Sequence, residues 1–108
     1  MISDDRVQQA LKYLATTDEP CARAEALYNG LDEQTKTVKG MSFLQLPEKL
    51  TVAEKEARVN ASQVVVEHNE KVQNAHVGFL IMKNKRKTEE LIVEVWRSVN
   101  ANRRKGNL

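Results

Sequence analysis

Hydrophobic residues follow a seven-residue repeat through residues 62–105. The repeat and the apolar positions between its members comprise Val65, Val72, Phe79, Met82, Val93 and Trp96. The stretch contains no proline, and Gly78 is its only glycine. Such spacing is typical of a helix that lies along partner helices. We therefore predict one long helix over 62–105, and a homo-oligomer that associates through these six side chains.

A shorter amphipathic pattern begins at the N-terminus. Ser3 is a suitable N-cap, and the two carboxylates that follow it suit the positive end of a helix dipole. Apolar residues then fall at Val7, Ala10, Leu11 and Leu14. That spacing predicts a first helix, which we expect to end at the polar residues 16–18.

The next apolar stripe indicates a second helix that extends to about Leu46. Thr17 or Asp18 would cap it, with Pro20 in its first turn, where a missing N–H is tolerated. Gly40 weakens helix formation, so we expect a soft point near it. Pro47 should end the helix, because a residue that precedes proline is disfavoured in the α region.

The sharpest local signal is the sequence Thr51-Val52-Ala53-Glu54. It matches a capping box, in which a threonine hydroxyl accepts from the N–H three residues later and a glutamate reaches back. It predicts a short helix that ends near Asn60, after which Ser62 caps the long helix. One continuous helix from Val52 onward is the alternative.

These elements predict an all-α protein in which short N-terminal helices pack on a long C-terminal helix, with coiled-coil-like association. We expect a single domain over 1–108, with a helical hairpin in 1–46 and the capped short helix plus the basic helix in 51–105. Arg86 and Asn100 interrupt the apolar seam. Arg86 can pair with Glu89 along the helix or point outward. Polar seam residues of this kind can set register.

Charge is distributed unevenly, although the net charge is only +2. Residues 1–70 hold 8 Lys/Arg and 12 Asp/Glu, whereas residues 71–108 hold 9 Lys/Arg and 3 Asp/Glu. A basic C-terminal part indicates an anionic partner, or an acidic end on another subunit. A solvated charged face is the plainer interpretation.

Two basic clusters form the candidate nucleic-acid-binding set: Lys83, Lys85, Arg86, Lys87, Arg97, Arg103, Arg104 and Lys105. Contacts between such side chains and phosphates release counterions and give affinity that does not depend on base sequence. Trp96 lies between the clusters. It is expected to pack, as are Tyr13, Tyr28, Phe43 and Phe79, and base stacking is its alternative role.

We find no pattern that predicts catalysis, a cofactor, a small-molecule substrate or a metal site. His68 and His76 would lie roughly 12 Å apart on a helix, too far to share a metal ion. Cys21 has no partner for a disulfide, no signal peptide is evident, and no stretch is apolar enough to span a membrane. These features predict a cytoplasmic protein.

Two stretches resemble a family of small helical phage proteins, the UvsY-like recombination mediators. They are the segment from Thr51 to Ala57 with Ala61-Ser62, and the terminal segment Glu90–Gly106; the resemblance covers roughly residues 50–106. It implies binding of single-stranded DNA and help in loading a recombinase onto strands covered by single-stranded-DNA-binding protein. The matching positions are Trp96, Arg97, Asn100, Asn102, Arg103 and Arg104. A module that binds only proteins is the alternative function.

Overall fold

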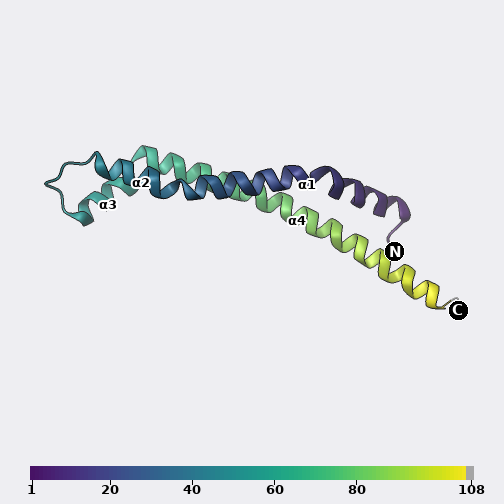
Figure 1. The fold of residues 1–108 in the computed structure, drawn as a ribbon. Coiled ribbons are helices and arrows are strands. Elements are labelled where there is room, and N and C mark those ends of the chain that lie inside the picture. The colour runs from purple at the N-terminus through teal and green to yellow at the C-terminus, as the bar shows by residue number, and fades with distance from the viewer. Residues whose placement is uncertain (107–108) are drawn as a thin grey trace. The chain divides into compact units, whose positions relative to one another are not determined.

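The computed structural model describes residues 1–106, which form no strand and are all-α, as the sequence predicts. The helices are α1 (Asp4–Glu33), α2 (Thr35–Leu44), α3 (Val52–Ala61) and α4 (Gln63–Gly106) (Figure 1). Contacts divide the chain into two compact units. The first unit joins Met1–Arg23 to Leu80–Leu108, and the second unit is Ala24–Phe79.

The Ser3 and Thr51 hydroxyls cap their helices as the sequence indicates. The Ser3 hydroxyl accepts a hydrogen bond from the Arg6 N–H at 3.1 Å, and α1 begins at the next residue. The Thr51 hydroxyl accepts from the Glu54 N–H at 3.2 Å, and α3 begins at Val52. Each bond satisfies a backbone donor that has no partner within the helix.

Ser62 separates α3 from α4, so the continuous helix considered as an alternative does not form. Its backbone is extended, with φ −67° and ψ 145°. The Ser62 hydroxyl donates to the Val59 carbonyl at 2.7 Å and accepts from the Val65 N–H at 3.4 Å. One side chain therefore binds the last turn of α3 and the first turn of α4.

The predicted break at residues 16–18 is wrong, because α1 continues through them to Glu33. The Thr16 and Thr17 hydroxyls each donate to the carbonyl four residues earlier, at 2.9 and 2.6 Å. These bonds remove the hydroxyls from competition with the helical backbone. Pro20 consequently lies inside a helix and leaves the Thr16 carbonyl without its usual N–H donor.

Arg86 of α4 binds the same turn of α1, in the first unit. Its Nη1 donates to the Leu14 carbonyl and to the Thr17 hydroxyl, both at 2.7 Å. Its Nη2 lies 3.4 Å from Oδ1 of Asp18. The Arg86 side chain is only 16% exposed. Arg86 therefore points inward, and these contacts hold the turn that precedes Pro20 against α4.

Glu89 pairs with Arg6 of α1 instead of with Arg86, which corrects the pairing predicted along the helix. Arg6 Nη2 donates to Glu89 Oε1 at 2.8 Å. Nη1 lies 2.8 Å from Oε2, but that contact is not aligned as a hydrogen bond. The hydrogen bond from Arg6 lowers the pKa of the buried Glu89 carboxyl, against the opposing effect of desolvation.

Helix α1 carries a seven-residue repeat of its own, and this repeat extends along most of its length. Its buried and half-buried positions include Val7, Ala10, Leu14, Thr17, Cys21, Ala24, Tyr28 and Leu31. Of the six α4 residues predicted for self-association, Val65 and Val93 are buried and the other four are half-buried. These six residues already lie along the inward seam of a single chain, and self-association through them remains a prediction.

The helical interruption falls at Gln34 and not near Gly40. Gln34 keeps α-region angles, φ −71° and ψ −14°, and its carbonyl accepts from the Val38 N–H at 3.0 Å. The helical hairpin predicted in 1–46 needs its turn at residues 16–18, and α1 runs through these residues without a break. Helix α2 then passes through Gly40 and ends at Leu44, shortly before Pro47.

Aromatic and polar contacts join the helices of the second unit. The Tyr28 ring of α1 stacks on the His76 ring of α4, with centroids 4.2 Å apart and planes 13° from parallel. The Thr35 hydroxyl lies 3.1 Å from Nε2 of the buried His68. Both histidines therefore contribute to helix pairing.

We expect Thr51→Ala to lower the free energy of unfolding by about 1 kcal/mol, because the first turn of α3 loses its cap. Urea unfolding followed by circular dichroism measures the change. Thr16→Ala is the control: it also removes a hydroxyl, but in mid-helix, where alanine is the better helix former. Equal stability of Thr51→Ala and wild type would show that the cap contributes nothing.

The Arg6–Glu89 pair should make stability depend on pH. A carboxyl whose pKa is lowered by folding stabilises the protein above its ordinary pKa of 4.5, and this contribution disappears as the pH falls through the lowered native value. We expect wild type to exceed Glu89→Gln in melting temperature at neutral pH. The difference should shrink below pH 4.5. A difference that stays constant down to strong acid would contradict this role for the pair.

Candidate nucleic-acid interface

Trp96 lies on α4 in the first unit, at a heptad position that faces α1. It is half-buried, and its indole N–H donates to Oδ1 of Asp4 at 3.0 Å. The ring therefore packs on one side, as expected for an aromatic residue in the seam, and keeps accessible surface. This hydrogen bond also fixes the direction of the indole ring, because Asp4 lies in the first turn of α1.

Two hollows adjoin the Trp96 side chain. One has a volume of about 350 Å³ and is lined by Ile2, Asp4, Val95, Val99 and Arg103, among others. The other has a volume of about 230 Å³ and is lined by Arg97, Asn100, Ala101 and Arg104. Asn100 borders both hollows, as Trp96 does. An aromatic ring thus lies between two recesses that arginines line.

The arginines of this end are exposed. Arg97 and Arg104 form no ion pair with any described residue. Arg103 donates from Nη2 to the Met1 sulfur at 2.6 Å, and its side chain remains on the surface. A thioether is a weak acceptor, so a phosphate oxygen would be a much stronger partner for Arg103. Lys105 is also exposed.

The first basic cluster differs, because part of it serves the fold. Arg86 binds α1 through three acceptors, and the Lys85 ammonium lies 4.6 Å from the centre of the Tyr13 ring. Lys83 and Lys87 are exposed. The eight predicted basic residues therefore do not form one surface: the second cluster surrounds Trp96, whereas the first is partly occupied by cation–π and hydrogen-bond contacts.

Sequence reasoning missed the participation of Met1 and Asp4 in this region. Asp4 is well explained by the helix dipole alone, and that explanation gives no reason to place it beside a residue 92 positions away. The acid–aromatic contact becomes visible only when α1 and α4 are paired. The pattern of charges along the sequence does not predict the contact between Asp4 and Trp96.

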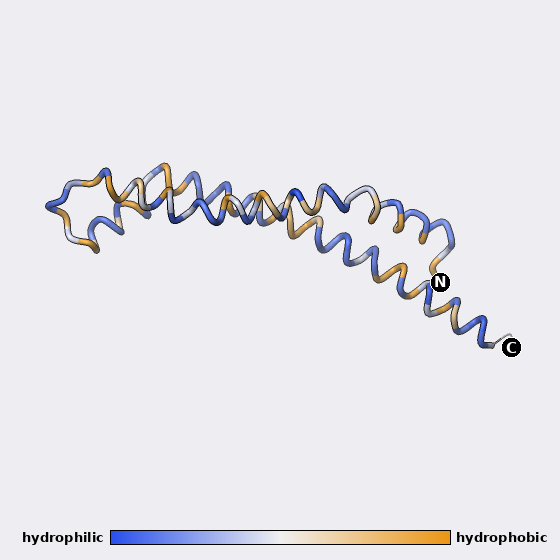
Figure 2. The backbone as a smooth tube through the Cα atoms, viewed as in Figure 1, coloured by the Kyte–Doolittle hydropathy of each residue, from blue (hydrophilic) through white to orange (hydrophobic). Residues whose placement is uncertain are grey.

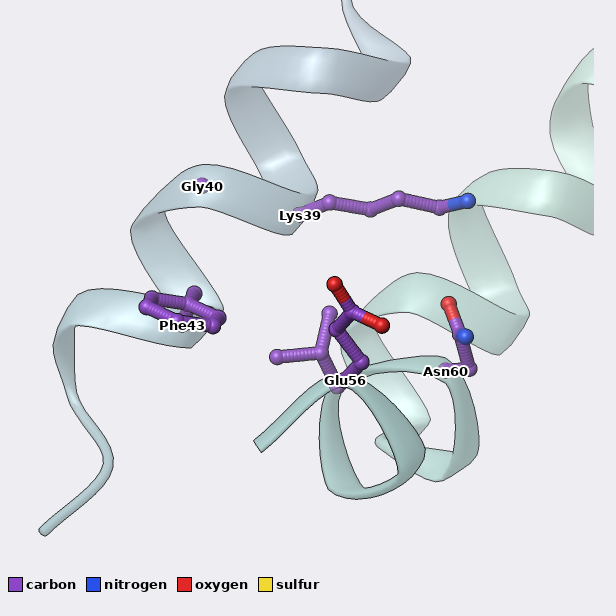
Figure 3. A pocket seen from close by; sticks show the side chains of 6 residues that line it. Lys39, Gly40, Phe43, Glu56 and Asn60 are labelled. Carbon is purple, nitrogen blue, oxygen red and sulfur yellow. The ribbon is translucent and has the colours of Figure 1, made fainter. Parts of the chain in front are cut away.

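A second candidate surface lies in the second unit, between α2 and α3. It is a groove of about 420 Å³ lined by Lys39, Gly40, Phe43, Glu56, Val59 and Asn60. Figure 3 shows the Phe43 ring on α2, with Glu56 and Asn60 coming from α3 and Lys39 reaching across from α2. A β-carbon added at Gly40 would meet no atom within 4 Å, so this wall of the groove is open.

The described residues contain no group of three or more His, Cys, Asp and Glu side chains arranged to hold a metal ion. Cys21 is a free, half-buried thiol in the seam of α1. Among residues 1–106, no helix combines the length and apolar character that crossing a membrane requires.

Comparison with known proteins gives no relative. No family model matches the chain, and neither a curated protein nor a solved structure matches it. The resemblance to phage recombination mediators therefore rests on the residues of this sequence alone.

Proposed function

We propose that this chain binds single-stranded DNA through the C-terminal end of α4. The observation that supports this most strongly is the position of Trp96 between two recesses lined by Arg97, Arg103 and Arg104. Single-stranded DNA offers flat bases for stacking and a phosphate on every nucleotide. Base–aromatic stacking contributes about 1–3 kcal/mol per base, and arginine–phosphate contacts add salt-dependent affinity.

Asp4 would modulate this binding. Its carboxylate accepts from the Trp96 indole and lies beside the recess that Arg103 lines. A carboxylate in that position repels phosphate, but it also orients the ring. A base would stack on the accessible part of the indole while the Asp4 hydrogen bond holds the other part.

The wider role that we propose is that of a phage-type accessory protein of DNA recombination or replication. It would assist the loading of a recombinase onto strands covered by single-stranded-DNA-binding protein, in the cytoplasm of a bacterial host. The residues of Glu90–Gly106 that resemble recombination mediators support this role, and Trp96, Arg97, Arg103 and Arg104 fall within them.

A protein-interaction module is the second candidate function, and the groove between α2 and α3 favours it. Phe43 and Val59 give the groove apolar lining, and Lys39 and Glu56 supply both signs of charge. Met41, Leu44 and Val52 are exposed on the same two helices, at 60%, 83% and 64%. Exposed apolar side chains beside a groove are typical of a protein-binding surface.

Replacing Arg103 and Arg104 together by alanine should weaken binding of a labelled oligothymidylate. Each lost phosphate contact removes a counterion release, so the slope of log affinity against log salt should shrink by about 0.7 per contact. Fluorescence anisotropy at several salt concentrations measures both quantities. Both side chains are exposed, so the melting temperature should not change.

The matched control for this experiment is Lys36→Ala with Arg58→Ala. It removes the same charge from exposed positions of α2 and α3. We expect the control to bind like wild type. Equal loss in both double variants would indicate nonspecific attraction to net charge. Wild type that fails to bind at low ionic strength would eliminate the DNA-binding function and leave the interaction module.

Two substitutions of Trp96 separate stacking from packing. Trp96→Phe keeps an aromatic face but loses the hydrogen bond to Asp4, whereas Trp96→Leu keeps apolar volume but loses the ring. If Trp96 stacks on a base, Trp96→Leu should bind roughly tenfold more weakly, and Trp96→Phe should retain most of the affinity. Melting temperatures of both variants serve as the control. Equal affinities for the two variants would assign Trp96 to packing alone.

A further inference from the structure

The outward side of α4 in the first unit carries a second row of apolar side chains. Ile81, Leu91 and Val95 are 65%, 58% and 50% exposed, and Asn84 and Thr88 fill the positions between them. In a helix of 3.6 residues per turn, these five positions form one stripe, opposite the inward heptad seam. We call it the outer stripe. Figure 2 shows apolar residues recurring at intervals along this part of α4.

We propose that the outer stripe binds the outer stripe of a second copy of this chain, with the two α4 helices antiparallel about a two-fold axis between Glu89 and Glu90. This register places Thr88 against Leu91 of the second copy and Asn84 against its Val95, while Ile81 at the end of the outer stripe faces Ser98 of the second copy. Because the axis is a two-fold, every contact occurs twice, and the assembly closes as a dimer.

Charge complementarity supports a second copy of this chain as the partner and an antiparallel orientation of its α4 helix. Lys87 and Glu94 lie seven residues apart along one border of the outer stripe, both exposed and without an ion pair to any described residue. In the antiparallel register, Lys87 lies beside Glu94 of the second copy. A parallel register forms neither pair and sets Arg97, Arg103 and Arg104 of the two copies side by side, where like charges repel.

The opposite border of the outer stripe does not prevent this pairing. Lys85 is the basic residue there, and its ammonium lies 4.6 Å from the Tyr13 ring of the same chain, on the α1 side. Five positions, two of them polar, bury less area than a standard interface. We therefore expect weak association, with a dissociation constant of roughly 10–100 µM.

Sedimentation equilibrium of the full chain, at concentrations from about 1 µM to 1 mM, covers the range of this expected dissociation constant of the dimer. We expect the mass to rise from 12.3 kDa to twice that value. Leu91→Ser should remain monomeric. Its control is Leu27→Ser on α1, where the leucine is 59% exposed, and this variant should dimerise like wild type. Wild type that stays monomeric, or that grows beyond a dimer, would overturn the proposal.

A charge exchange tests the register. Lys87→Glu should weaken dimerisation about tenfold, because two attractive pairs become repulsive. Adding Glu94→Lys to the same chain restores both pairs and should restore the wild-type constant. Failure of the double variant to recover would refute the antiparallel register. The readout is mass, so this result is independent of DNA binding, which the inference does not require.

Discussion

The contacts of Arg86 with one turn of α1 are the interaction on which the first unit depends most. A guanidinium offers five donors in a fixed fork, and here it satisfies a backbone carbonyl, a hydroxyl and a carboxylate. That turn precedes Pro20, where the helix lacks an N–H. A helix with threonines and a proline at its centre is weak alone. Its continuity therefore depends on a cation supplied from the other end of the chain.

Polar seam residues also explain register in both units. Glu89 accepts from Arg6, and His68 lies at hydrogen-bond distance from Thr35. Glu89 and His68 are both buried, and an unpaired buried polar group costs about 1–3 kcal/mol. A shift of one helix past its partner would separate the pairs. An apolar seam would tolerate such a shift more easily, so the polar positions select one alignment of helices that lack a large core.

The sequence could predict those interactions whose two partners lie close together along the chain, and it could not predict those whose partners lie far apart. The caps at Ser3, Thr51 and Ser62 were predictable, because each hydroxyl binds an N–H only three residues away. The continuity of α1 was not, because the donor to Thr17 is 69 positions distant. For the candidate site, residue types alone predict Trp96 and its arginines, and that choice stays a proposal. The contact of Lys85 with the Tyr13 ring and the contacts of Arg86 with α1 could not be predicted, because they depend on how α1 and α4 pair.

Helix α4 therefore has three surfaces with different chemistry: the inward seam, the outer stripe and the C-terminal end around Trp96. The use of one surface limits what the other two can bind. The inward seam packs against the other helices of the same chain, whereas the outer stripe of the first unit stays exposed. In the antiparallel register, each Trp96 lies six to seven residues from the two-fold axis. At 1.5 Å per residue, the two rings would be about 20 Å apart along the helix direction. One strand that reached both would bind with a high effective concentration at the second site. Association that is weak alone would then strengthen when DNA is present, because the strand and the protein interface hold the same two chains together.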